Sequence, residues 1–341
     1  MRIRIAIIAL CLVAISLAGG LATIASAQTP LQKQNEQLFE KMAAVFGLTD
    51  AQMTKIRRIF AHSGYIGQGD PAIARHPVTQ AQCRAKLEEM AIRYENPRFE
   101  KICGSKYLVP LYDPATQEPE DAKVCIDQFE FPDIPCTYPV VWVRAREAAE
   151  LCEAEGKRIC DAHEWEGACA GSLKPPDYDF DLARGVGPSA AVSRMRAAHN
   201  RKYAPGKTWS YGPAYRPGAC AAASSKSPTC NGGNWAQCGS NTYPAGDFPA
   251  CHSPLGVYDL NGNAAEHMNL PLLPDEMSSR GSKKLGYTEM KGSWFIFDKY
   301  RAHPDWCRWR APYWHGSRVM DLASHANYHL GFRCCKTLDA H

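Results

Sequence analysis

The chain has 341 residues, of which 45% are hydrophobic and 22% charged, and its formal net charge is +4. Acidic and basic residues are interspersed, so the composition indicates no nucleic-acid partner and predicts a solvated surface. After residue 27, no stretch approaches the roughly 20 apolar residues that a membrane-spanning helix needs. The length allows one large domain and an N-terminal extension.

Residues 1–27 have the three parts of a signal peptide. Two arginines form a positive start, residues 5–17 are apolar, and an Ala-Ser-Ala cleavage site ends at Ala27. A membrane anchor is disfavoured because the apolar run is short, and a lipoprotein because the residue before Cys11 is leucine rather than a small one. We therefore predict an exported chain that is cleaved after residue 27 and is periplasmic or secreted.

Cysteine is frequent in this chain. Fifteen cysteines include Cys11 in the leader and fourteen after it. An even number in an exported chain predicts disulfides, up to seven of them. A zinc site would need Cys-x2-Cys pairs, and the sequence has none. Cys334 and Cys335 are adjacent, so we expect them to pair with different partners.

Residues 28–120 are predicted to be a helical extension followed by an irregular linker. Apolar residues recur at helical spacing over 33–60, with one glycine between two helices. Thr49 and Gln52 form a capping box for the second of these helices. We expect the pair to pack on the main domain, or alternatively to bind a partner. A further helix is expected over 83–95.

Residues 121–337 are predicted to form the main domain. Within it, residues 171–255 lack periodicity and are rich in Gly, Pro, Ser and Asn. A structureless loop of this length is uncommon, and its four cysteines suggest that disulfides hold it. Elsewhere the pattern predicts strands over 124–131, 138–143 and 292–301, and helices over 144–155 and 163–171.

Four motifs in this domain carry a family resemblance. They are "YPVVWVRAREAAELCEAEGKRICDAHEWEGAC", "GVYDLNGNAAEH", "KGSW" and "LGFRC", in this order and at characteristic spacing within residues 124–335. The chain thereby resembles the formylglycine-generating enzyme, or sulfatase-modifying factor, family. The resemblance implies an α+β fold related to C-type lectins, which is disulfide-rich, has little regular secondary structure and binds calcium.

The resemblance also implies two disulfides. The family joins the cysteine before Gly-Lys-Arg to the one in Gly-Phe-Arg-Cys, here Cys152 to Cys334. It joins the cysteine after Glu-Trp-Glu to one that corresponds to Cys307, here Cys169. Cys160 and Cys335 are additional cysteines, and we expect a third bridge between them.

The segment "YDLNGNAAE" resembles the calcium loop of the family. The implied ligands are the carboxylates of Asp259 and Glu266 and the backbone carbonyls of Gly262 and Ala264. Calcium takes hard oxygen ligands of this mixed kind. The alternative from the residues alone is an Asn-Gly hairpin turn without a metal.

The segment after the Gly-Ser pair departs from the family. In catalytic members, two cysteines in this segment bind a copper ion that activates dioxygen, and soft thiolates suit copper(I). Ser293 is kept here, but Ile296 and Arg301 stand at the two cysteine positions. Neither side chain ligates copper, so we expect no copper and no formylglycine synthesis by that mechanism.

Another metal centre is an alternative. Asp321, His325 and His329 are spaced four apart and offer the two imidazoles and one carboxylate of non-haem iron oxygenases. The competing interpretation is a loop with two polar histidines. Iron-dependent relatives of this fold also use histidines from an N-terminal bundle, and residues 28–60 contain none.

Three functional hypotheses follow from these observations. The first is an exported domain of this family that binds a small-molecule ligand or a protein partner and has no formylglycine-generating activity. The second is a periplasmic oxidoreductase with a different centre, for example non-haem iron, such as an enzyme that oxidises a siderophore precursor. A structural envelope component is a third. Fold alone does not decide among them.

Overall fold

The computed structural model describes residues 27–311 and 316–338, so the predicted signal peptide lies outside the described residues except for Ala27. The helices are α1 Pro30–Phe46, α2 Asp50–Ser63, α3 Gln80–Glu89, α4 Pro97–Cys103, α5 Ala145–Ala154, α6 Ala162–Ala170 and α7 Pro188–Tyr203. The strands are β1 Leu108–Leu111, β2 Val124–Asp127, β3 Arg158–Ile159, β4 Ala265–Leu270, β5 Tyr287–Lys291, β6 Leu330–Phe332 and β7 Cys334–Thr337.

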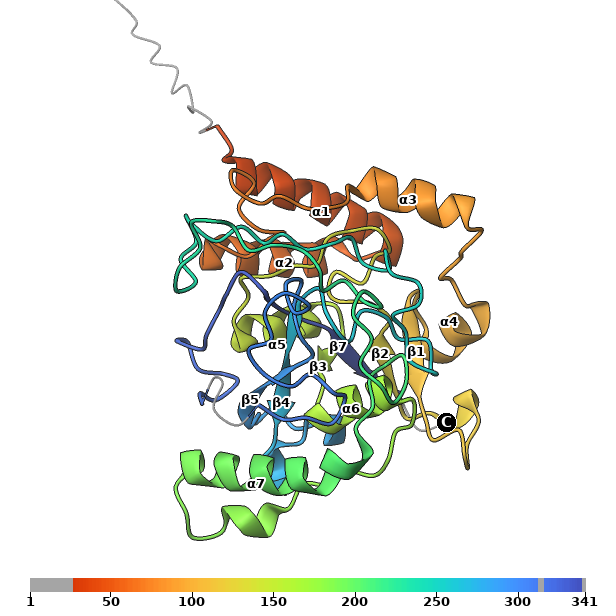
Figure 1. The fold of residues 1–341 in the computed structure, drawn as a ribbon, viewed down its shortest axis with the longest axis vertical. Coiled ribbons are helices and arrows are strands. Elements are labelled where there is room, and N and C mark those ends of the chain that lie inside the picture. Colours follow the sequence, from red (N-terminus) through yellow and green to blue (C-terminus); the bar gives the residue numbers. More distant parts are fainter. Residues whose placement is uncertain (1–26, 312–315, 339–341) are drawn as a thin grey trace, which may run out of the picture.

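The strands lie in the middle of the molecule, between α1 to α3 at one end and α7 at the other (Figure 1). They form two small sheets, with orders β1-β2-β7-β3 and β5-β4-β6. The first sheet is antiparallel, while β4 pairs antiparallel with β5 and parallel with β6. Since only Arg333 separates β6 from β7, the end of the chain joins the two sheets. This is the predicted α+β fold with little regular structure.

The N-terminal helices pack on the main domain. Thr49 and Gln52 make the predicted capping box of α2, and the preceding helix ends at Gly47 in the left-handed conformation. Met42 and Ile56 are fully buried in a core that also contains residues of α5 and β6. The helical extension therefore shares its hydrophobic core with the domain that follows it. None of the helices in the described ranges combines the length and apolar character that a bilayer crossing requires.

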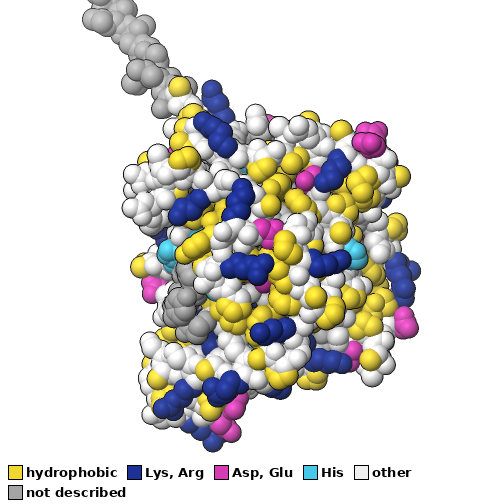
Figure 2. Space-filling model, in the orientation of Figure 1, with side chains coloured by type: hydrophobic (Ala, Val, Ile, Leu, Met, Phe, Trp, Pro, Cys, Tyr) yellow, Lys and Arg dark blue, Asp and Glu magenta, His cyan; other side chains and the backbone are white. Residues whose placement is uncertain are grey.

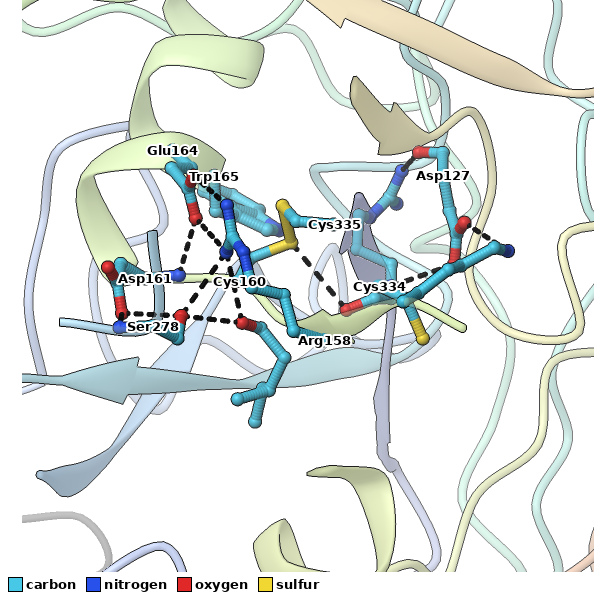
Figure 3. Close-up of a disulfide and its surroundings, with 12 residues drawn as sticks. Asp127, Arg158, Cys160, Asp161, Glu164, Trp165, Ser278, Cys334 and Cys335 are labelled. Atoms are coloured by element: carbon cyan, nitrogen blue, oxygen red, sulfur yellow. Dashed lines mark hydrogen bonds and ion pairs between the residues drawn. A yellow bond between two sulfur atoms is a disulfide. The ribbon is translucent and has the colours of Figure 1, made fainter. Parts of the chain in front are cut away.

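Seven disulfides join the cysteines of the described residues. Cys334 bonds to Cys152 of α5, and Cys335 bonds to Cys160, the residue after β3, as Figure 3 shows for the second of these bridges. The structure brings together both pairs that the family resemblance implies and also the third pair. The bridges are Cys83–Cys136, Cys103–Cys125, Cys152–Cys334, Cys160–Cys335, Cys169–Cys307, Cys220–Cys251 and Cys230–Cys238.

Three expected elements in the first half are shorter than predicted. Over 138–143 only Val141 makes a β-bridge, to Gly67, because the next residue, Trp142, has a left-handed φ of 60° that ends strand pairing. The helix expected over 83–95 ends at Glu89. The strand expected over 124–131 ends at Asp127, and its last residues form bends instead.

The strand expected over 292–301 is wrong. The strand in this region, β5, ends at Lys291, and Gly292 then takes a left-handed φ of 73°. A side chain at Gly292 would lie 2.7 Å from the carbonyl oxygen of Leu260, so the backbone is too close for a larger residue. Residues 295–299 form a turn, in which the Ile296 carbonyl accepts hydrogen bonds from two later amides.

The long segment 171–255 contains α7, which the sequence pattern did not reveal. This helix buries Ala191, Val192 and Met195, but it also buries Arg196 and His199. Polar residues on the buried face remove the hydrophobic periodicity on which the prediction depended. Disulfides do hold the later part of the segment, as the sequence indicated.

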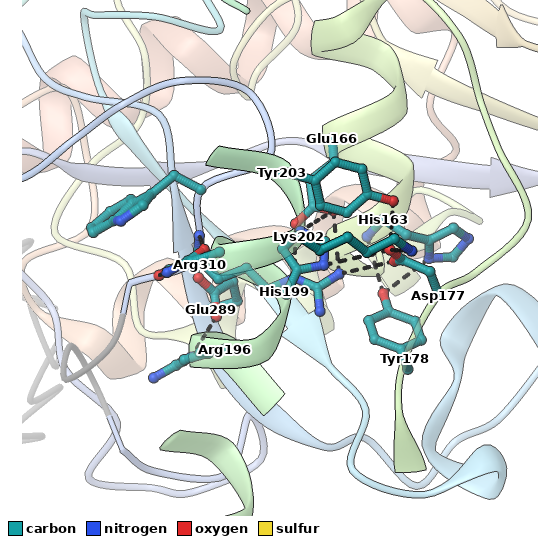
Figure 4. Close-up of polar contacts among 12 residues, drawn as sticks. His163, Glu166, Asp177, Tyr178, Arg196, His199, Lys202, Tyr203, Glu289 and Arg310 are labelled. Carbon is teal, nitrogen blue, oxygen red and sulfur yellow. Dashed lines mark hydrogen bonds and ion pairs between the residues drawn. The ribbon is translucent and has the colours of Figure 1, made fainter. Parts of the chain in front are cut away.

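Buried charges hold α7 against β5 (Figure 4). The Arg196 guanidinium donates to the Glu289 carboxylate at 2.7 Å and to the Thr288 carbonyl at 2.5 Å. The other oxygen of Glu289 accepts the backbone amide of Ala311 at 2.8 Å. Arg196 and Glu289 are 1% and 0% exposed, so each charge depends on the other for compensation.

We predict that Arg196→Ala destabilises the protein by about 3–5 kcal/mol, because it leaves the Glu289 carboxylate buried without its partner. Urea unfolding with the disulfides intact measures this change. Arg194→Ala is the matched control, since Arg194 is exposed on the same helix and surface substitutions usually change stability by less than about 0.5 kcal/mol. Equal midpoints for the two variants would contradict the role assigned to this ion pair.

Candidate functional site

The retained serine of the Gly-Ser pair is a buried anchor. The Ser293 hydroxyl donates to Asp305 Oδ2 at 3.0 Å, and the indole of Trp209 donates to Asp305 Oδ1 at 2.7 Å. The Asn261 amide donates to the Asp305 backbone carbonyl at 2.8 Å. Burial raises the pKa of Asp305 to about 6. Ser293 therefore fixes the start of the turn to the segment that precedes the Cys169–Cys307 bridge.

The two positions at which we expected a copper-binding member to carry thiolates hold other side chains. Ile296 is 4% exposed and packs in a cluster with Val141 and Trp294. The Arg301 guanidinium lies over the ring of Tyr215, 3.8 Å from its centroid. The Ile296 side chain thus contributes to a hydrophobic cluster, and the Arg301 side chain makes a cation–π contact.

A basic pocket of about 610 Å³ lies beside this turn. Lys299, in the turn, donates from Nζ to the Ser225 hydroxyl at 2.7 Å, and the amide of Ser224 donates to the Phe295 carbonyl at 2.7 Å. Three cationic side chains line the pocket, and no carboxylate is among its lining residues in the described ranges. The lining includes Arg75, Ser224, Ser225, Lys226, Ser227, Thr229, Asn241, Tyr243 and Lys299.

Positive and negative side chains are mixed on the surface of the protein. On the face shown in Figure 2, Lys and Arg side chains are spread over the surface with Asp and Glu among them, and they do not gather in one continuous block. The basic pocket is defined by its lining residues, which include three cations. Lys226 and Lys299 are exposed, which leaves their ammonium groups accessible to a ligand.

The predicted calcium loop contributes two carboxylates to a buried acidic cluster. Glu266 accepts two hydrogen bonds of 2.7 Å from Arg333 and one of 2.9 Å from the Trp165 indole. Glu130 accepts the Ala264 amide at 2.6 Å. Asp259 Oδ2 accepts the amide of a glycine at 2.6 Å, whereas its Oδ1 is buried without a hydrogen-bond partner.

The loop is not the hairpin turn of the alternative interpretation. Among the strands of the described residues, β4, which follows the loop, is paired with the later strands β5 and β6, and it makes one further bridge, from Asn269 to Asp161. Asn261 is engaged on both sides, since its Oδ1 accepts the Ser210 amide at 2.9 Å. Gly262 has a φ of 129°, and a side chain there would lie 3.0 Å from the Ala221 carbonyl oxygen. The Asn-Gly pair thus closes a packed loop rather than a strand connection.

The charges of this cluster favour an added cation. Three buried carboxylates, those of Glu130, Asp259 and Glu266, face one guanidinium, that of Arg333. Burial raises the pKa of Asp259 to about 7, and burial together with the Asp259 carboxylate raises the pKa of Glu130 well above its usual range. The free oxygen of Asp259 and the surplus of negative charge fit a hard divalent cation. We propose calcium at this position, held by Asp259, Glu266 and the loop carbonyls.

The structure does not assemble the alternative iron ligands. Asp321 is exposed and caps the amide of Ala323, while His329 is buried and stacks on Trp294 with ring centroids 4.6 Å apart. Burial lowers the pKa of His329 to about 3. Asp321, His325 and His329 are not among the groups of the described residues whose ligand atoms all lie within 4.8 Å of one another.

One such group outside the predicted sites is Glu166, Asp177 and His199 (Figure 4). Glu166 already accepts Arg310 Nε at 2.8 Å and the ammonium of Lys291 at 3.1 Å. These two cations compensate the Glu166 carboxylate. The Asp177 carboxylate accepts hydrogen bonds from Lys202 and Tyr203. The group is therefore a structural ion-pair network under α7.

Comparison with protein-family models places residues 65–338 in the sulfatase-modifying factor enzyme 1-like domain, also called FGE-sulfatase. The match spans well over half of the chain. The chain belongs to the sulfatase-modifying factor family. The helices α1 and α2 precede the matched region.

Other comparisons add little to the family assignment. Among solved structures, the crystal structure of CarF matches with a TM-score of 0.26 and 16% identity, over 78% of this chain and 86% of that chain. At these values we base no inference on CarF. No curated protein matches the chain.

Sequence reasoning within the sulfatase-modifying factor family missed several polar residues of the site. Glu130, Asp305 and Arg333 were not selected, although each holds a loop in place. Glu130 lies between Phe129 and Phe131, and in the strand expected there its carboxylate would point to the face opposite the two rings, so the sequence contained no signal of its burial. No local pattern marks Asp305 either.

We predict that calcium stabilises the protein more at pH 8 than at pH 5. The folded-state pKa of Asp259 exceeds its ordinary value of 3.8, so the metal-free fold loses stability as the pH rises from about 4 through 7. Calcium would offset this loss by binding the ionised carboxylate, and a ligand at a hundred times its dissociation constant adds about 2.7 kcal/mol.

Thermal unfolding with calcium or with EGTA at both pH values measures this effect. Asp259→Asn should show a weaker response both to calcium and to pH, whereas Asp321→Asn, at an exposed carboxylate, should behave like the wild type. A wild-type melting temperature that does not change with EGTA at pH 8 would remove calcium from this cluster.

Proposed function

We propose that this member of the sulfatase-modifying factor family is an exported binding protein that takes a small multivalent anion in the basic pocket and makes no formylglycine. The observation that supports the ligand is the lining itself, with three cations, several hydroxyl and amide groups and no carboxylate within the described ranges. Concave sites with a few convergent polar groups are the usual form of small-molecule sites.

The position of the pocket supports the same proposal. Lys299 lies between Ile296 and Arg301, so the turn that would carry the copper thiolates contributes a cation to the pocket instead. Ser225 holds Lys299 Nζ at 2.7 Å, and Asn241 holds the backbone of both Arg75 and Ser225, with bonds of 2.6 and 2.7 Å. The lining is therefore connected by hydrogen bonds before a ligand arrives, which reduces the entropy lost on binding.

We predict that pyrophosphate, citrate or phosphate binds saturably in the presence of physiological salt, as measured by isothermal titration calorimetry. The double variant Lys226→Gln, Lys299→Gln should bind at least tenfold more weakly. A charge-assisted hydrogen bond contributes about 1.5–3 kcal/mol, and 1.4 kcal/mol is a factor of ten in affinity.

Lys283→Gln, Lys284→Gln is the matched control, because it removes the same charge from a surface away from the pocket. Equal loss in both double variants would mean that the anions respond only to net charge. Absence of binding by all three anions would contradict the proposed ligand class.

We also predict no aldehyde formation when the protein is supplied with copper(I) and a peptide containing Cys-x-Pro-x-Arg. The reason is that Ile296 and Arg301 provide no thiolate. Mass spectrometry of the peptide, with a no-protein control, measures the product. Ile296→Cys, Arg301→Cys tests whether two substitutions suffice for copper binding. Aldehyde from the wild type above the control would refute the proposed loss of activity.

A further inference from the structure

Three aromatic side chains surround a second pocket, of about 420 Å³. The ring centroids of Tyr65 and Trp235 are 5.2 Å apart, those of Trp142 and Trp235 5.1 Å, and those of Tyr65 and Trp142 6.4 Å. Tyr65 is 47% exposed, whereas Trp142 is 5% exposed and is the most buried of the three. Together with Arg144, Asn234, Ser324 and His325, these rings form what we call the aromatic pocket.

Separate parts of the chain hold the rings in place. The bridge between Gly67 and Val141 sets the segment of Tyr65 beside that of Trp142. From α1, the Asn35 amide donates to the Ile66 carbonyl at 3.0 Å. Trp235 lies in the short loop that the Cys230–Cys238 disulfide closes. The fold thus constrains each ring from a different direction.

Trp142, the most buried ring, has an uncommon backbone conformation and an indole N–H without a hydrogen-bond acceptor. Trp142 has a φ of 60°, which is uncommon for a bulky residue and is found where the surroundings impose it, frequently at functional sites. Its Nε1 is buried without a hydrogen-bond partner, and so is the hydroxyl of Ser324, another residue of the same pocket. An unpaired buried polar group is costly, so either side chain would gain a hydrogen bond by turning toward a ligand in this pocket.

The charges of the pocket restrict the class of ligand. Its described lining contains Arg144 and His325 and no carboxylate, which disfavours a quaternary ammonium ion despite the aromatic rings. The rings are inclined to one another by 40° to 69°. A flat nucleobase would need two parallel faces, so this geometry disfavours stacking on both sides of a base. The suitable ligand has apolar faces and a polar edge, and is neutral or anionic.

We propose that the aromatic pocket binds a saccharide. The C–H faces of a sugar ring pack on Tyr65 and Trp235, and its hydroxyl groups meet Trp142 Nε1, the Ser324 hydroxyl and the Asn234 side chain. The sugar can be neutral, or it can carry a carboxylate, because the Arg144 guanidinium lines the pocket and would attract a negative charge.

This site is distinct from the basic pocket. The two pockets share no lining residue. The segment 224–240 runs between them, with residues 224–229 on the basic pocket and residues 233–235 on the aromatic one. The saccharide proposal therefore stands independently of the proposed anion.

A glycan array probed with the full exported chain tests the saccharide proposal, and isothermal titration calorimetry measures the affinity for the best glycan. We expect saturable binding that weakens at least tenfold in Trp235→Ala and in Tyr65→Ala. Trp235→Phe should restore part of the affinity, because it returns a ring to the same loop. Tyr211→Ala is the control, since Tyr211 is a partly buried tyrosine outside both pockets.

The remaining outcomes are equally decisive. Lys226→Gln, Lys299→Gln should leave glycan binding unchanged, which separates this site from the basic pocket. Wild-type binding no stronger than that of folded Trp235→Ala over the whole array overturns the proposal. Binding of tetramethylammonium or adenosine that depends on Trp235, without any glycan, would also overturn it. A melting temperature near that of the wild type confirms that each variant is folded.

Discussion

The buried ion pair between Arg333 and Glu266 is the interaction on which the rest of the structure depends. Arg333 lies between β6 and β7, and Glu266 is in β4, so two bonds of 2.7 Å join the two sheets. The same guanidinium donates to the carbonyls of Asp127, Gln128 and Tyr258, at the end of β2 and before the acidic loop. A buried charge must have such partners. Those partners are provided only when both sheets and the loop are in register.

Networks of this kind, with the disulfides, replace the long strand ladders that this fold lacks. The Arg196–Glu289 pair docks α7 on β5 of the second sheet, and the Arg310–Glu166 bonds dock the segment after β5 on α6. Removing one partner from such a pair costs more than forming the pair contributes, because the other charge remains buried. These networks consequently specify one arrangement of the loops, and the disulfides limit the freedom of the unfolded chain. A rigid, mostly irregular surface follows, on which pockets keep their shape.

The sequence predicted those features that depend on local chemistry. The capping box at Thr49, the helix over 144–155 and the α+β class were correct because caps and apolar periodicity act over a few residues. The α7 helix escaped prediction because Arg196 on its buried face is compensated by Glu289, which is distant in sequence. For the same reason the aromatic pocket could not be foreseen, since Tyr65 and Trp235 meet only through the fold.

The hydrogen bonds that fix the backbone around residues 292–301 do not involve the side chains of Ile296 and Arg301. Ser293, Trp165 and Arg333 are hydrogen-bonded to buried acids and position the backbone. Neither Ile296, in the turn over residues 295–299, nor Arg301, which follows that turn, is a partner in those three bonds. Substitution in the turn therefore changes the chemistry without a large effect on the frame. Substitutions at positions 296 and 301 can thus alter the side chains offered there while the disulfide-bonded frame stays folded.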